Sequence, residues 1–156
     1  MTIRNTRLLV IDTSVVCAAG QTEHPVSSAC REVLYAVLNI CHQAAVTTTM
    51  QKEWKDHMSH VSVRWRSSMT ARKKLKTNFQ PEKVFLDCSQ LTDGDRHTIE
   101  EDWHVLEAAL SADRVIITHD DSFRRALEKT RKGARLLNSI AWIDPMANGL
   151  ESVRSL

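Results

Sequence analysis

The stretch Arg7-Leu8-Leu9-Val10-Ile11-Asp12 decides the fold, because a nearly continuous apolar run ends there in an acid. A run without polar alternation is typical of a strand buried on both faces, as in parallel sheets. The stretch Arg114-Val115-Ile116-Ile117-Thr118 repeats the pattern and is followed by His119 and Asp120. Both stretches predict interior strands of one sheet, each with a carboxylate just beyond its end.

Helical and extended patterns alternate along the rest of the chain. Between Val26 and His42 apolar residues recur every three or four positions, which predicts an amphipathic helix. Thr98-x-x-Glu101 matches a capping box, which predicts a helix that starts there and runs to about residue 111. Further strands are expected at about 44–48, 83–87 and 139–145, and further helices at about 50–60 and at 122–132, closed by Gly133. The alternation indicates a parallel sheet covered by helices on both faces.

The composition is that of one folded domain. A chain of 156 residues with 42% hydrophobic and 26% charged residues is expected to form a single domain over residues 1–156. No apolar run approaches the ~18 residues that would suggest a membrane span, and the first residues lack a signal-peptide pattern. We therefore expect a cytoplasmic protein without a membrane partner. The 4 cysteines contain no C-x-x-C pair and are interpreted as free, buried thiols.

The net charge of +2 conceals a separation of charge along the chain. Between Lys52 and Lys76 eight Lys and Arg residues accompany two acids, whereas between Asp87 and Asp102 six acids accompany one Arg. A basic segment could attract a polyanion and an acidic cluster could hold cations, although solvated helix faces also produce such runs. Residues 61–80, within and beyond the basic segment, are expected to form a basic helical excursion: one helix, or a pair standing off the body.

Four carboxylates from four predicted elements are expected to converge. Asp12 and Asp120 follow the first and fourth strands, and ligands of open parallel sheets bind beyond the carboxyl ends of the strands. Asp102 shares the spacing of the apolar residues of its helix, which places it on the sheet-facing side in the first turn. Glu53 lies early in the helix after the second strand. Clustered carboxylates require a compensating cation, and their oxygens favour Mg²⁺ or Mn²⁺, which can support phosphodiester hydrolysis.

The same acids also have ordinary structural interpretations. An Asp after a strand is often a helix cap or turn former, so any one of these acids is more often structural than catalytic. Other acids are assigned to structure, namely Glu101 to the capping box, Asp121 to a helix cap, and Asp93 and Asp95 to a turn. Three hydroxyl residues at strand ends are either donors behind the carboxylates or ordinary turn residues: Thr13, Ser14 and Thr118.

Four blocks of sequence, in order, resemble the PIN domain. They are Leu8-Leu9-Val10-Ile11-Asp12-Thr13-Ser14-Val15, Thr47 to Glu53, Asp102-Trp103-His104-Val105-Leu106-Glu107-Ala108-Ala109, and Val115-Ile116-Ile117-Thr118-His119-Asp120. The resemblance spans about residues 7–145 and implies a three-layer α/β/α sandwich with a central, mainly parallel sheet of four to five strands. It also implies a Mg²⁺- or Mn²⁺-dependent endoribonuclease similar to VapC-like toxins, with these catalytic metal ligands: Asp12, Glu53, Asp102 and Asp120.

The chain departs from the PIN pattern at two places, and the resemblance also implies RNA and protein partners. The basic stretch 61–80 is longer than in small toxin-type members, and His119 stands where the family usually has Gly. RNA is the implied substrate, and Trp65 either stacks on a base or lies in the core. Phosphate contacts are expected from six basic residues: Arg64, Arg66, Arg72, Lys73, Lys74 and Lys76. A toxin would also pair with an antitoxin protein, and the resemblance suggests a homodimer.

Two other kinds of function stay open on the sequence. One is a catalytically inactive PIN-like module that binds RNA or a protein, and the other is a structural α/β domain whose acids cap helices. His57-x-x-His60 has no third ligand beside it, so a metal pair is the weaker interpretation. His104 is expected on the helix surface or as a core histidine with satisfied nitrogens.

Overall fold

A computed structural model describes residues 6–156 and contains one five-stranded sheet in which every pairing is parallel. The strand order is β3-β2-β1-β4-β5, with β1 in the centre. The strands are β1 Leu8–Ile11, β2 Gln43–Ala45, β3 Leu75–Lys76, β4 Val115–Ile117 and β5 Ala141–Ile143. The two stretches with which the sequence analysis began are the central strand and its neighbour, and Leu9, Val10 and Ile11 are fully buried.

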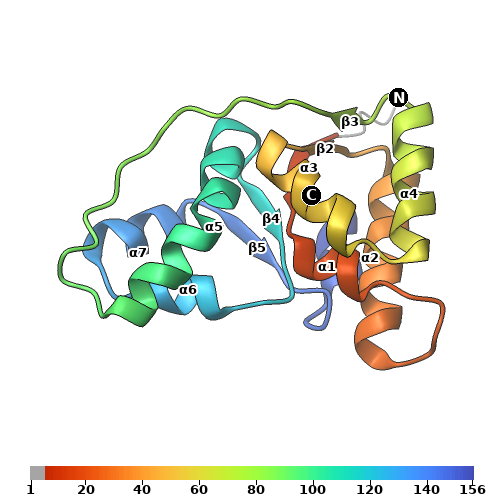
Figure 1. Cartoon of the computed structure of the whole chain (residues 1–156). Helices are drawn as coiled ribbons and strands as arrows, with labels where there is room; N and C mark the ends of the chain where they lie inside the picture. The colour runs from red at the N-terminus through yellow and green to blue at the C-terminus, as the bar shows by residue number, and fades with distance from the viewer. Residues whose placement is uncertain (1–5) are drawn as a thin grey trace.

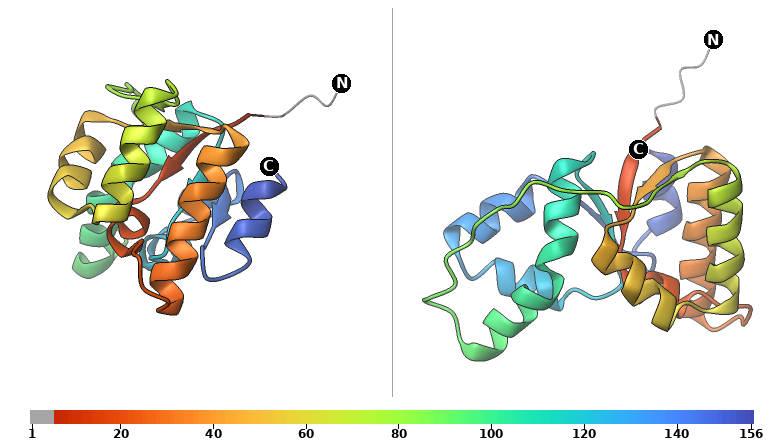
Figure 2. Two further views of the ribbon diagram at one scale, coloured as in Figure 1. Left: turned by 90° about the vertical axis from the view of Figure 1, so that its right-hand side faces the viewer. Right: turned by 45° about the horizontal axis from the view of Figure 1, so that its top comes forward.

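Helices cover both faces of the sheet, so the predicted three-layer α/β/α sandwich is confirmed (Figures 1 and 2). On one face α1 packs on α2 and α3, and α2 also packs on α4 and α8; on the other face α5 packs on α6, β1 and β4, and α6 packs on α7. The helices are α1 Thr13–Ala18, α2 Pro25–Ile40, α3 Thr48–His57, α4 His60–Ala71, α5 Asp93–Ser111, α6 Ser122–Leu127, α7 Arg131–Asn138 and α8 Gly149–Arg154.

The basic stretch 61–80 is not an excursion from the body. Its helical part is α4, which ends at Ala71 and packs along α2. Trp65 is fully buried and its indole Nε1 donates to the Leu34 carbonyl of α2 at 2.8 Å. Its ring lies 5.9 Å from that of Trp54 in α3. Residues 61–71 thus belong to one helix, which was one of the two alternatives, and the other alternative, a helix pair standing off the body, is wrong. Apolar residues at the i, i+4 spacing of Val61, Trp65 and Met69 give α4 a buried face.

Residues 83–87 do not form the strand predicted for them. The third strand is instead Leu75–Lys76, and residues 77–92 contain no helix or strand. This long connection crosses from β3 to the start of α5 on the opposite face (Figure 1). It is held through Val84, whose N donates to Glu107 Oε2 at 2.9 Å and whose carbonyl accepts from Trp103 Nε1 at 2.9 Å. Two side chains of α5 therefore hydrogen-bond the backbone N and carbonyl of Val84, which in a sheet would pair with a neighbouring strand.

Two helix boundaries also differ from the prediction. Helix α5 begins at Asp93 rather than at Thr98, because Thr92 is its N-cap and accepts from Asp95 N. Thr98 lies inside the helix and donates to the Gly94 carbonyl. The predicted helix 122–132 is two helices, α6 and α7, and Gly133 lies within α7 rather than closing a helix. A side chain at Gly133 would collide with the Leu127 carbonyl, so this glycine permits close packing.

The cysteines were expected to be free and buried, and no helix was expected to span a membrane. All four cysteines are free, as expected, but only Cys30 is buried and Cys17 is exposed. Within residues 6–156 no helix is both long enough and apolar enough to cross a membrane.

Candidate active site at the carboxyl edge of the sheet

Asp12 and Asp120 lie beyond neighbouring strand ends. Val10 pairs with Ile116 and Ile11 with Ile117, so β1 and β4 end together. Asp12 continues the pairing by one step, since its N donates to the Ile117 carbonyl at 2.9 Å. The crossover after β1 leads to one face of the sheet and the one after β4 to the other, so the two acids lie where the connections diverge. This topological switch point is where open parallel sheets bind their ligands.

Hydroxyl groups orient the carboxylate of Asp12. Its Oδ2 accepts from Ser14 Oγ at 2.7 Å and from Thr118 Oγ1 at 3.0 Å. Ser14 Oγ in turn accepts from His119 N at 3.1 Å, and Thr118 Oγ1 accepts from Asp120 N at 3.2 Å. Two of the three predicted hydroxyl residues therefore link the β1 end to the β4 end through the Asp12 carboxylate.

Asp102 approaches the same place from α5. It lies in the third turn of α5 rather than in the first turn as predicted, because the helix begins at Asp93. It lines a small, partly enclosed hollow together with Asp12 and Asp120. Burial, followed by the negative charge of Asp12, raises the pKa of Asp102 from 3.8 to about 7, with further contributions from Asp120 and Glu53 and an opposing one from His104. The raised pKa reports crowding of carboxylates with too little positive charge nearby.

Glu53 reaches the site from α3 and is held on both sides. Thr13 Oγ1, the third predicted hydroxyl, donates to Glu53 Oε2 at 2.9 Å. His104 Nε2 lies 3.0 Å from Glu53 Oε1. The contact with His104 lowers the pKa of Glu53 most; burial opposes it, and Thr13 and His57 lower it further. Unlike Asp102, Glu53 therefore favours its charged form.

All four predicted acids line one open cavity of about 370 Å³, together with Thr13, Ser14, His57 and Glu101. Their oxygens are the hard donors that Mg²⁺ and Mn²⁺ prefer, and the raised pKa of Asp102 shows that added positive charge would be stabilising there. The donor set thus fits a divalent cation in chemistry. It is not a preassembled coordination shell, because among residues 6–156 no group of three or more His, Cys, Asp and Glu is arranged to hold a metal ion.

Three acids near the cavity differ in role from the predictions. Asp121 is the residue before α6 but makes no capping bond, and it pairs with Arg125 at 2.9 Å. Asp120 Oδ1 accepts from Ser122 N at 2.9 Å, so one of the four acids is also a capping group. Glu101 belongs to no capping box and lies 3.3 Å from His97.

The six basic residues lie on α4, in the turn that follows it and, for Lys76, in β3. Arg64, Arg72, Lys73 and Lys76 are exposed, whereas Arg66 and Lys74 are partly buried. Because Trp65 is fully buried, it cannot stack on a base from the surface. The core interpretation of Trp65 is therefore correct.

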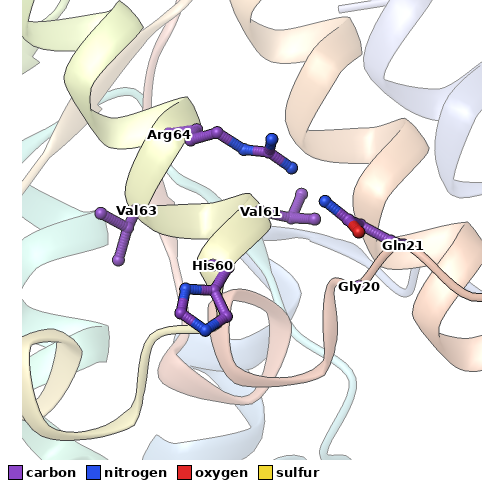
Figure 3. A pocket seen from close by; sticks show the side chains of 6 residues that line it. All are labelled: Gly20, Gln21, His60, Val61, Val63 and Arg64. Carbon is purple, nitrogen blue, oxygen red and sulfur yellow. The ribbon is translucent and has the colours of Figure 1, made fainter.

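Another cavity, of about 530 Å³, lies away from the acids, between the loop after α1 and the start of α4 (Figure 3). Arg64 and Gln21 point toward one another across it, and Val61 lies between them (Figure 3). His60 lines this cavity whereas His57 lines the acidic one. His57 and His60 therefore line different cavities. This arrangement does not favour a metal site shared by the two histidines.

His104 belongs to the site although the sequence did not predict it there. It was expected on the helix surface or as a satisfied core residue, but its side chain is 18% exposed and contacts Glu53. Residues i and i+2 do not share a helix face, so the position of His104 two residues after Asp102 gave no signal in the sequence. His119 contacts Asp144 at 3.5 Å through Nδ1.

Comparisons with known proteins identify no relative. No family model, no curated protein and no solved structure matches the chain. The geometry of the acidic cavity is therefore the basis on which a function can be proposed.

Proposed function

We propose that the protein is a metal-dependent nuclease, most specifically an endoribonuclease of the PIN type. The observation that carries the proposal is the acidic cavity, in which Asp12, Glu53, Asp102 and Asp120 come from four separate elements and line one hollow at the switch point of the sheet. A cluster whose member Asp102 has its pKa raised to about 7 by burial and by its neighbours is stabilised by a divalent cation.

The chain's own residues would divide the work at this site. Asp12, Glu53, Asp102 and Asp120 would hold Mg²⁺ or Mn²⁺, which when bound supplies Lewis-acid polarisation of a phosphodiester and stabilises its developing charge. Ser14 and Thr118 fix the carboxylate of Asp12. The apolar side chains below the acids shield one side of the cluster from water: Val105, Ile116, Phe123 and Trp142.

RNA is the proposed substrate because of the resemblance to VapC-like ribonucleases and because basic side chains lie exposed on the same molecule. Arg64, Arg72, Lys73 and Lys76 present positive charge on and after α4, and such groups contact nucleic-acid phosphates. If the protein is a toxin, the acidic cavity is the natural target for an antitoxin that blocks activity.

The first experiment is Asp12→Asn, assayed for cleavage of a broad RNA panel in Mn²⁺. Loss of a ligand carboxylate should lower the cleavage rate at least about 100-fold, because cation occupancy falls. EDTA should abolish cleavage by the wild type. Asp56→Asn, an exposed acid one turn from Glu53 in α3, is the matched control and should cleave at the wild-type rate. Cleavage by Asp12→Asn at the wild-type rate would rule out the proposal.

A catalytically inactive RNA-binding module is the second candidate, favoured by the exposed basic residues. It predicts RNA binding that survives EDTA and Asp12→Asn, with no cleavage by the wild type, and binding that weakens steeply with salt. The structural alternative, favoured by the bond from Ser122 N to Asp120, predicts neither cleavage nor RNA binding nor Mn²⁺ binding by calorimetry. One set of binding and cleavage assays separates all three.

A further inference from the structure

The carboxylate of Glu53 is held by two donors from different elements. Thr13 Oγ1 donates to Oε2 at 2.9 Å, and His104 Nε2 lies 3.0 Å from Oε1. Thr13 directly follows Asp12, and His104 lies two residues after Asp102 on α5. Each holder is therefore a near neighbour of another proposed ligand, so the orientation of Glu53 is tied to the positions of Asp12 and Asp102.

The environment of His104 leaves Glu53 as its polar partner. Both ring nitrogens are shielded from solvent, and among residues 6–156 neither has a hydrogen-bond partner of good geometry. The 3.0 Å approach of Nε2 to Glu53 Oε1 is therefore the polar contact available to the ring. A buried N–H group is unfavourable unless it meets an acceptor. The Glu53 carboxylate is that acceptor, and Nε2 rather than Nδ1 is the ring atom that faces it.

The contact also joins the two helical layers. Helix α3 lies on one side of the sheet and α5 on the other (Figures 1 and 2), and residues of both helices line the acidic cavity. A free glutamate side chain samples many rotamers, and ordering it opposes binding by the lost entropy. A carboxylate has about four lone-pair positions, so one that accepts from Thr13 and His104 still has positions for a cation.

We propose that His104 is a positioning residue, which holds the Glu53 carboxylate in the orientation that a divalent cation requires. The inference rests on the proposed function, since the cation is the one proposed above. Groups that orient metal ligands typically contribute about 10–100-fold to metal affinity or activity. No requirement is placed on the charge of His104, because the neutral ring with a proton on Nε2 is also a donor.

Three substitutions of His104 separate its role in orienting Glu53 from the mere volume of its side chain. In His104→Gln the side-chain amide can place an N–H near the position of Nε2, whereas in His104→Asn the shorter side chain reaches only the position of Nδ1, which faces no acceptor. His104→Ala removes the donor altogether. His97→Ala, on the same helix, is the matched control, because His97 also lies near a glutamate, at 3.3 Å from Glu101, but is exposed.

The readouts are Mn²⁺ affinity by calorimetry, kcat and KM on an RNA substrate, and the position of Glu53 in metal-free crystal structures. We expect His104→Ala and His104→Asn to weaken Mn²⁺ binding at least about tenfold and to lower kcat more than they change KM. His104→Gln should stay within about threefold of wild type, as should His97→Ala. In the metal-free crystals Glu53 should leave its position in the Ala and Asn variants and keep it in the Gln variant.

The results distinguish a failure of this inference from a failure of the proposed function. If the wild type neither binds Mn²⁺ nor cleaves RNA, the nuclease proposal fails, while displacement of Glu53 in the Ala and Asn variants still upholds the positioning role. If the wild type is active and all three variants match it with Glu53 unmoved, the positioning role is overturned. Equal losses in the Gln and Ala variants, with both proteins folded by circular dichroism, would also overturn it.

Discussion

The acidic cavity and the helical layer around α2 treat buried polar groups in opposite ways. Around α2, Trp65 donates to the Leu34 carbonyl, Ser62 donates to the Val16 carbonyl, and the ring of His42 lies between Arg7 N and the Val153 carbonyl. In the cavity, carboxylates face one another and the pKa of Asp102 is raised to about 7. The α2 layer pairs these buried polar groups, whereas the carboxylates of the cavity repel one another.

The largest expected effect on folding comes from Trp65→Ala. It removes the side chain that joins α4 to α2 and leaves the Leu34 carbonyl without its donor. We expect the free energy of unfolding to fall by about 3–5 kcal/mol, measured by urea denaturation. Ser67→Ala, on the exposed side of the same helix, should change it by less than about 0.5 kcal/mol. A small effect of Trp65→Ala would mean that α4 is not part of the stable layer.

The opposite sign is expected for Asp102→Asn in EDTA. The folded-state pKa of Asp102, about 7, lies above its usual value of 3.8, so the folded protein keeps a proton that the unfolded chain has lost. Stability contributed by that proton is present at pH 4 and is lost as the pH rises through 7. We expect Asp102→Asn to be more stable than wild type at pH 8, by on the order of 1–2 kcal/mol, and equally stable at pH 4. If Asp102→Asn is only as stable as wild type at pH 8, repulsion among the cavity carboxylates does not destabilise the folded protein, and the two regions do not differ in this way.

The smallest effect concerns His42, which is 1% exposed. Burial lowers its pKa, and the charge of Arg7 adds to this, while the bond to the Val153 carbonyl opposes it. The unfolded chain therefore takes up a proton below about pH 6.5 that the folded protein does not, so stability is lost as the pH falls. Between pH 7.5 and 5.5 we expect wild type to lose up to about 1 kcal/mol relative to His42→Gln, measured by urea midpoints. Parallel pH profiles of the two proteins would contradict a neutral, fully paired His42.

The sequence was most informative about the fold where burial alone shapes the pattern. The apolar runs of β1 and β4 predicted the centre of the sheet because both faces of these strands are covered. Residues 83–87 misled because they have a strand-like composition, yet their backbone bonds to the side chains of Glu107 and Trp103. A partner supplied by side chains of a distant helix leaves no local pattern in the sequence.

The same limit applies to the site. Asp12 and Asp120 could be placed from their strands, because the carboxyl ends of parallel strands share one edge. The place of Asp102 along its helix was wrong because the helix was expected to start at Thr98, whereas Thr92 is the N-cap and accepts from Asp95 N. The contact of His104 with Glu53 joins residues from two layers, and a spacing rule within one helix does not reveal it.

The bond from Thr118 to Asp12 joins residues 106 positions apart, and this has a consequence for the order of events during synthesis. The residues that complete the cavity, Asp102 and Asp120, leave the ribosome long after Asp12 and Glu53. Because loop closure precedes such distant contacts, the cavity assembles late in folding. A nascent chain that has not yet emerged beyond residue 120 therefore has no complete acidic cavity. Under the proposed function, such a chain would not cleave the messenger RNA beside it.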